Sequence, residues 1–444
     1  MSSRNIYTLS FLWISLFLSC CAQKTPAPTS ISIEGDQWYI NGSLVNQGSA
    51  AEGLLMNVRM VNAIFEDDSQ KILEYDPDFD ADQNTEKFIQ SIPLYVEQGI
   101  NAFTISLQGG LPGYEGAINS AYNADGSLRT EYLERADQVI TAASKAGAAV
   151  ILTCFYQRQH SHERALTGKD AIIDAVANVV AWIESQKYSN VLLEISNEYA
   201  HGGFKNWTDG EWLSSAAGQV ELIEYAQSLN PDLYVSTSGM GNGLIPESIA
   251  RVSDFILIHF NNTALVDIPE KVKLASVYGK PVVCNEDDKI GLTGAEAAKL
   301  SVLAGAGWGL MQSGQNQDAP FRFEGAADDS LVYEMISKLT TPGVEIDQSQ
   351  STEMSVLITE PKDGDIYATD ETITIKAALS GLEAFSDLEV HFRNGKQLLG
   401  KSETDPWTFN WENIPAGKYE IEAMVRDQEG QEVVRSRKVD IEVR

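Results

Sequence analysis

Eight short apolar runs between residues 52 and 340 constrain the fold of this chain more than any other feature. They lie at 54–60, 100–107, 148–156, 191–196, 233–238, 254–260, 281–286 and 307–312. Amphipathic stretches such as 131–147 and 171–186 separate them, and each ends at Gly, Asn or another helix stop signal. Eight strand–helix repeats of this length predict an α/β fold, a (β/α)8 TIM barrel.

A doubly wound sheet is the chief competing fold. It usually has fewer strands and carries a glycine-rich phosphate-binding turn after the first strand. The glycine-rich segment 107–122 follows the second run and lacks that spacing. We therefore interpret it as a long loop.

The segments that flank the barrel have a different pattern. Residues 31–45 alternate apolar and polar side chains around Asn41-Gly42, which predicts a β-hairpin that could cap the lower face of the barrel. A Pro/Gly/polar linker follows residue 339, and the chain after it reads as short strands separated by turn signals. The predicted domains are 31–345, the barrel with its hairpin, and 346–444, an all-β, Ig-like sandwich.

The first 30 residues carry a targeting signal. Arg4 precedes an apolar run that is too short for a comfortable membrane span and ends in small residues, so 1–21 reads as a secretory signal. Its end resembles a bacterial lipobox, in which Cys20 or Cys21 would be lipidated, and a plain cleaved signal is the alternative. Residues 22–30 form a short tether. We expect a lipoprotein of the bacterial cell envelope, on the outer membrane, or a secreted protein, and a membrane contact only through this N-terminal anchor.

Charge and metal-binding residue types exclude several classes of partner. Lys plus Arg number 32 against 63 Asp plus Glu, a formal charge of −31, which argues against nucleic acid. Cys154 and Cys284 lie in apolar runs and read as small buried hydrophobic residues. His160 and His162 are too isolated to suggest a metal. We expect no metal and no organic cofactor.

In a TIM barrel, active residues lie at the carboxyl ends of the strands. Two glutamates stand there, Glu198 after the fourth run and Glu286 after the seventh. Paired carboxylates in one cleft are what glycoside hydrolysis requires, one as acid and base and the other as nucleophile or water-positioning group. The other candidates at strand ends are Arg59, Tyr156, Asn197, His259, Trp308 and Gln312. The same strand ends also offer Asn57, Gln157, Asn261 and Asp287.

A strand-four Asn-Glu with a strand-seven Glu resembles the retaining glycoside hydrolases of clan A, which include cellulase- and mannanase-type enzymes. The resemblance covers about residues 31–345. It implies that Glu198 is the acid/base, Glu286 the nucleophile and Asn197 a donor to the sugar 2-hydroxyl. Arg59 and His259 match groups that lie near the nucleophile in this clan, and Trp308 matches a tryptophan that stacks under the sugar.

Three departures weaken the match to any single family of the clan. The sixth run reads "IHFNN" and lacks the tyrosine that cellulase-type members commonly place beside the nucleophile. The third ends "CFYQRQ" where many members have histidine, and "EDDK" after the nucleophile is more acidic than usual. The clan is therefore the better match, and the sugar cannot be carried over from one family.

Several residues have two readings. Trp308 is a sugar platform or simply core, His259 is functional or structural, and the loop Gln315–Gln317 offers sugar partners or solvated polar groups. Glu194 is expected to point away from the pocket or to pair with a Lys or Arg.

The predicted function is a retaining hydrolase that cleaves β-glycosidic bonds in a polysaccharide or oligosaccharide. The alternative is a non-catalytic glycan-binding lipoprotein on a degenerate barrel. The C-terminal segments "ITEPKDGDIY" and "PAGKYEIEAMVRDQEG" resemble bacterial Ig-like modules of carbohydrate-active enzymes, which act as spacers and sometimes bind glycans. The sugar, endo or exo action and the oligomeric state stay open.

Overall fold

The computed structural model describes residues 28–444, with gaps at 111–116, 161, 348–354, 363, 381–387, 405, 427–429, 431 and 437. The predicted signal 1–21 and most of the tether lie outside the described residues. Within the described part, no helix is long and apolar enough to cross a bilayer.

Eight parallel strands form a closed barrel, and each of the eight apolar runs contains one of them. The strands are β4 (Asn57–Arg59), β5 (Ala102–Ser106), β8 (Ala149–Phe155), β9 (Val191–Ser196), β10 (Val235–Ser236), β11 (Ile256–His259), β12 (Val282–Glu286) and β13 (Gly309–Leu310). They pair in the order β10-β9-β8-β5-β4-β13, and β11 pairs with β12. The bridges Ser238–Leu257 and Val283–Gly307 join these two sheets at both edges and close the ring. The predicted fold class is confirmed.

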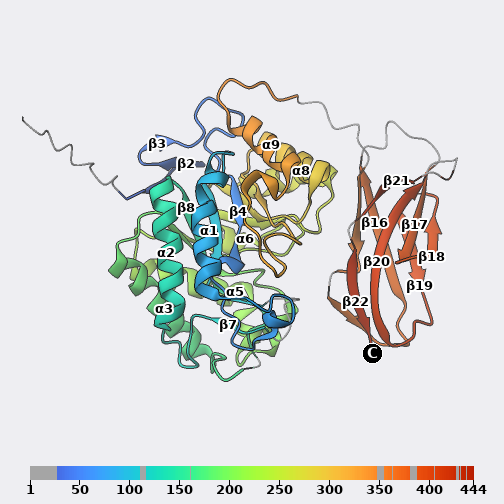
Figure 1. The fold of residues 1–444 in the computed structure, drawn as a ribbon, viewed down its shortest axis with the longest axis horizontal. Coiled ribbons are helices and arrows are strands. Elements are labelled where there is room, and N and C mark those ends of the chain that lie inside the picture. Colours follow the sequence, from blue (N-terminus) through green and yellow to red (C-terminus); the bar gives the residue numbers. More distant parts are fainter. Residues whose placement is uncertain are drawn as a thin grey trace, which may run out of the picture.

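Helices surround this barrel and cover its outer face (Figure 1). They are α1 (Ala81–Val96), α2 (Thr130–Ala146), α3 (Lys169–Gln186), α4 (Gly210–Leu213), α5 (Ala216–Leu229), α6 (Glu247–Val252), α7 (Ile268–Ser276), α8 (Gly291–Ala304) and α9 (Ser330–Thr340). Helix α2 shows why they form: Val139, Ile140 and Ala143 recur at helical spacing and are buried. Gly147 then ends the helix with φ 82°, a left-handed conformation that glycine adopts without a steric penalty.

The lower end of the barrel is closed by the predicted hairpin. Strands β1 (Ile31–Glu34), β2 (Gln37–Ile40) and β3 (Ser43–Leu44) form a small antiparallel sheet. Trp38 on β2 is fully buried and meets the rings of Tyr234 and Phe255 edge to face. It shares a hydrophobic cluster with the residues at which the barrel strands begin. The carboxyl ends of the strands are therefore left as the open end.

The C-terminal part is a sandwich of two sheets. Strands β14 (Ser355–Glu360), β16 (Ile373–Ser380) and β19 (Trp407–Trp411) form one sheet. The other contains β15 (Asp365–Tyr367), β17 (Glu389–Asn394), β18 (Gln397–Ser402), β20 (Gly417–Arg426), β21 (Glu432–Arg435) and β22 (Val439–Val443). Alternate residues such as Val390 and Phe392 fill a core of its own. The predicted boundary at 345/346 falls between the end of α9 and the start of β14.

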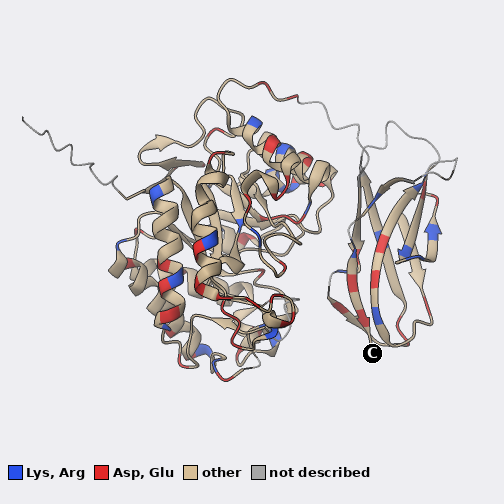
Figure 2. Cartoon of the chain, in the orientation of Figure 1, with Lys and Arg blue, Asp and Glu red and all other residues tan. Residues whose placement is uncertain are grey.

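Acidic residues are found in both domains and account for the net charge. Figure 2 shows Asp and Glu along the outer helices and loops of the barrel and along the sandwich strands. Many of them lie next to Lys or Arg, as in the pairs Glu247–Arg251 and Glu334–Lys338 one helical turn apart. The charge is therefore distributed over the outer surface, as expected for solubility.

Candidate active site

Glu198 follows β9 in a constrained backbone conformation. Its φ is +46°, in the left-handed region that few non-glycine residues adopt. The Glu198 N–H donates to Ser238 Oγ at 2.9 Å, and its carbonyl accepts from the His201 N–H at 2.8 Å. These bonds hold the turn at which the strand ends, and backbone strain of this kind clusters at functional sites.

Glu286 is the last residue of β12, and two side chains hold its carboxylate. Arg59 Nε lies 3.0 Å from Glu286 Oε2, and Asn261 Nδ2 donates to Oε1 at 2.7 Å. Arg59 ends β4, and Asn261 follows β11. The side chains of Arg59 and Glu286 are only 3% and 7% exposed, so this ion pair is shielded from solvent. Both donors bind the ionised form of the carboxylate.

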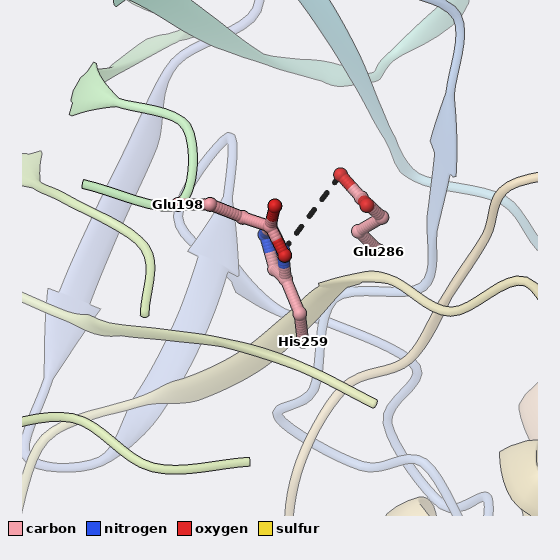
Figure 3. Close-up of side chains that lie close together, drawn as sticks. All are labelled: Glu198, His259 and Glu286. Atoms are coloured by element: carbon pink, nitrogen blue, oxygen red, sulfur yellow. Dashed lines mark ion pairs between the residues drawn. The ribbon is translucent and has the colours of Figure 1, made fainter. Parts of the chain in front are cut away.

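His259 lies between the two glutamates (Figure 3). Its Nδ1 is 3.6 Å from Glu198 Oε1 and 3.7 Å from Glu286 Oε2, and the ring is fully buried. Burial lowers the His259 pKa, but the charges of Glu286, Glu198 and Glu194 outweigh burial and raise the pKa above its ordinary value. Burial likewise raises the pKa of Glu198, but His259, His201 and Arg59 outweigh it and lower that pKa.

The side chains of Glu198, His259 and Glu286 could also bind a small cation. One ligand atom each from Glu198, His259 and Glu286 lies within 4.8 Å of the other two. However, the positive charge beside Glu286 already comes from Arg59, at the same Oε2 that faces His259. The guanidinium therefore already occupies the charge-balancing role that a cation would have beside Glu286.

Five of the predicted site residues line one cleft at the open end of the barrel: Arg59, Tyr156, Asn197, Glu198 and Glu286. Asn197 donates to Gln157 Oε1 at 3.4 Å, so the amide of the Asn-Glu pair points along the cleft wall. The three remaining candidates do not line it.

Those three residues lie in the packed interior. His259, between the two glutamates, is 0% exposed. Trp308 is 0% exposed, and its indole N–H donates to Asp287 Oδ2 at 2.9 Å, so its ring has no free face for stacking on a sugar. Gln312 is 6% exposed and donates to the Asp328 carbonyl at 3.2 Å. Of the two readings of Trp308, the structure shows the core one.

The expectation for Glu194 was wrong. Its carboxylate is fully buried, and Oε2 accepts from Thr153 Oγ1 at 2.5 Å and from Asn285 Nδ2 at 3.5 Å. Successive side chains of a strand alternate between its two faces, so Glu194 lies on the same face as Leu192, which packs in the cluster at the lower end of the barrel. It therefore faces inward, and its partners are uncharged.

Two of the three amide side chains singled out in the loop after β13 are buried rather than solvated. Asn316 and Gln317 are 0% and 1% exposed. Asn62 Nδ2 donates to both of their carbonyls, and Gln317 Nε2 donates to the Arg59 carbonyl at 2.7 Å. These amides stabilise the loop and the end of β4.

Sequence reasoning missed the contact of Asn261 with Glu286 and the position of His201 on the cleft wall. Counting strand ends offers Asn261, two residues beyond the end of β11, but no local pattern shows its contact with Glu286. His201 is the N-cap of a 3-10 helix, Gly202–Asn206, and no motif marks it.

A parallel barrel with two glutamates at the ends of its fourth and seventh strands resembles glycoside hydrolase domains, and the sandwich that follows it resembles a bacterial Ig domain. More particularly, residues 77–233 match the family described as cellulase (glycosyl hydrolase family 5), and residues 355–423 match the bacterial Ig domain family. No curated protein matches the chain.

Three solved structures illustrate what the chain is similar to. The fibronectin(III)-like modules of Clostridium thermocellum CbhA share 23% identity over 20% of this chain and 94% of theirs, with a TM-score of 0.18. A β-glucuronidase of Parabacteroides merdae shares 10% over 94% of this chain and 51% of its own, with a TM-score of 0.43. A Bacteroides uniformis β-glucuronidase shares 12% over 94% and 48%, with a TM-score of 0.42. The chain spans about half the length of these two enzymes.

Proposed function

We propose that the protein is a retaining glycoside hydrolase that cleaves β-glycosidic bonds in a polysaccharide or oligosaccharide. The observation that carries the proposal is the approach of Glu198 and Glu286, which have carboxylate oxygens within 4.8 Å of each other. Retaining enzymes hold their carboxyl groups about 5–5.5 Å apart, whereas inverting enzymes leave room for a water at about 6.5–9.5 Å. The match of residues 77–233 to cellulases supports the β-linkage.

The contacts of each glutamate divide the roles. Glu286 is held on both oxygens by Arg59 and Asn261, which suits a nucleophile that must stay ionised and aimed. Glu198 faces the cleft beside His259 and is the acid/base. It donates its proton to the glycosidic oxygen while Glu286 attacks the anomeric carbon, so that the leaving alcohol departs and a glycosyl ester forms on Glu286.

In the second half, Glu198 removes a proton from a water that attacks the anomeric carbon, and the ester bond to Glu286 breaks. Both glutamates return to their starting protonation states, and the configuration of the sugar is retained. Asn197 and Tyr156 line the cleft beside Glu198 and bind sugar hydroxyls. The N-terminal signal supports a lipid anchor at Cys20 or Cys21 and an outer-membrane or secreted location.

A trapping experiment tests the mechanism directly. An aryl 2-deoxy-2-fluoro-β-glycoside with a good leaving group slows both steps and should leave the fluorosugar on the enzyme. Digestion and mass spectrometry should find the label on the peptide that contains Glu286, and the Glu286→Gln variant should stay unlabelled. Label on another carboxylate would overturn the assignment.

Azide rescue assigns the second glutamate. With an activated aryl glycoside, Glu198→Ala should form the glycosyl ester and then hydrolyse it slowly, because no base activates water. Added azide needs no base and should restore turnover with a β-glycosyl azide as product. If both the wild type and Glu198→Ala bind oligosaccharides but never turn them over, the protein is the glycan-binding lipoprotein instead.

A further inference from the structure

The orientation of the Asn261 amide can be fixed from chemistry alone. Its contact with Glu286 Oε1, at 2.7 Å, joins the amide to a carboxylate that has no hydrogen to donate when ionised. The amide must therefore present its NH2 group to Glu286, and its Oδ1 must point elsewhere. That oxygen is shielded from solvent and has no hydrogen-bond partner among the described residues. A buried polar atom without a hydrogen-bond partner destabilises the protein, and a bound donor would remove that cost.

The side chain has little freedom to turn away. Its neighbours are held by backbone bonds from Phe260 N–H to the Glu286 carbonyl at 3.0 Å and from Asn262 N–H to the Gly241 carbonyl at 2.8 Å. Gly241 passes so close that a Cβ added to it would lie 3.1 Å from the Asn261 Cβ. Asn261 also lines the cleft that contains both glutamates. The unpartnered oxygen is thus presented, in a fixed place, beside the nucleophile.

We propose that Asn261 has two roles, which rest on the function proposed above for Glu286. Its Nδ2 positions the Glu286 carboxylate for attack. Its Oδ1 accepts a hydrogen bond from a hydroxyl of the sugar ring that occupies the site next to Glu286, which makes Asn261 a specificity-determining residue. The preferred substrate therefore has a free hydroxyl at that ring position, and sugars in which the position is deoxygenated, methylated or acylated are poor substrates.

The sugar contact is tested with a set of aryl glycosides, each lacking one ring hydroxyl, assayed on the wild type and on Asn261→Ala. For the wild type, one of these deletions should lower kcat/KM by about 10-fold or more, the effect of a hydrogen bond lost in a buried site. For Asn261→Ala the same deletion should have little further effect, because its partner is already gone. Equal effects of every deletion on both proteins would overturn the sugar contact.

The variant Asn261→Asp separates the two roles, because it keeps an acceptor oxygen but has no NH2 group and repels Glu286. It should keep the discrimination among the deoxy sugars, while its rate of trapping by the fluorosugar falls at least 10-fold. An unchanged trapping rate in this variant would overturn the positioning role. Asn242→Ala, a nearby exposed asparagine that does not line the cleft, is the matched control and should behave as wild type in both assays.

Failure of this inference is distinguishable from failure of the proposed function. If Glu286→Gln still turns over substrate, the proposed function is wrong whatever Asn261 does. If Glu286→Gln is inactive and unlabelled, but the Asn261 variants match the wild type in trapping and in sugar discrimination, the function stands and the inference is wrong.

Discussion

Arg59 contacts Glu286 although β13 separates their strands in the barrel: Nε of the arginine lies 3.0 Å from Oε2 of the glutamate. The long arginine side chain spans the width of one strand, and both groups are nearly fully buried. Breaking a buried ion pair from one side leaves an uncompensated charge, which costs about 3–5 kcal/mol.

We expect Arg59→Lys to lower kcat/KM by about 100-fold or more, because a lysine ammonium cannot reproduce the fixed geometry of a guanidinium. Arg59→Met should be worse and should also lower the free energy of unfolding, because Glu286 loses its counter-charge. Steady-state kinetics and urea unfolding of both variants measure this. Full activity in Arg59→Lys would show that the pair is structural only.

The low pKa of Glu198 gives a pH prediction. The acid role requires the protonated form, so kcat/KM should fall as the pH rises through this pKa. Burial raises the Glu198 pKa, but the neighbouring His259, whose Nδ1 lies 3.6 Å from Glu198 Oε1, lowers it more, and His201 adds to the effect. His259→Gln should therefore shift the basic limb of the kcat/KM profile to higher pH, and His201→Gln should shift it less. His391→Gln, in the sandwich, is the control and should shift nothing.

His259 also links stability to pH. Its folded pKa is raised above the ordinary value of about 6.5, so the folded state binds the proton more tightly than the unfolded chain does. The resulting stabilisation is present below about pH 6.5 and is lost as the pH rises through the raised pKa. The difference in unfolding free energy between wild type and His259→Gln should therefore decrease across that window in a pH series of urea unfolding. A difference that grows with pH would contradict the assignment.

Glu194 should matter for stability rather than for proton transfer. Glu194→Ala removes the acceptor of Thr153 and Asn285, and buried donors left without partners cost about 1–3 kcal/mol. Glu194→Gln keeps one acceptor oxygen in nearly the same volume and should cost less. In thermal or urea unfolding, stability should decrease from wild type to Glu194→Gln to Glu194→Ala. Variants more stable than wild type would show that the buried carboxylate destabilises the fold.

Replacing Trp308 tests whether this residue is part of the core or a platform for stacking on a sugar. Trp308→Phe keeps an aromatic face but leaves Asp287 without its indole donor, so we expect a loss of about 1–3 kcal/mol in unfolding free energy. Its KM for long oligosaccharides should stay close to wild type, because the ring is buried. A raised KM together with unchanged stability would restore the platform role.

The barrel strands and the positions of the two glutamates could be predicted from the spacing of apolar residues in the sequence. Runs such as 148–156 and 191–196 became β8 and β9 because continuous apolar stretches of this length suit strands that are buried on both faces. The positions of Glu198 and Glu286 followed from counting strands, because the carboxyl ends of parallel strands meet at one end of a barrel.

Side-chain contacts across the barrel could not be predicted in this way. Whether Trp308 lies on the cleft wall or in the core depends on one donor–acceptor pair, with Asp287, that no local pattern encodes. Glu194 resembles any polar strand residue in sequence, but its burial depends on Thr153 and Asn285 from two other strands. The contact of Asn261 with Glu286 likewise depends on how the chain turns after β11.

The hairpin that closes the lower end has a consequence for how the protein would be oriented at a membrane. Thr29, just before β1, is bound to Ser144 at the end of α2, so the chain enters the barrel from the closed side. The anchor proposed at Cys20 or Cys21 would join the protein on this closed side and would leave the mouth free to face away from the membrane. Polymer chains outside the cell would then reach the glutamates without first passing between the protein and the lipid.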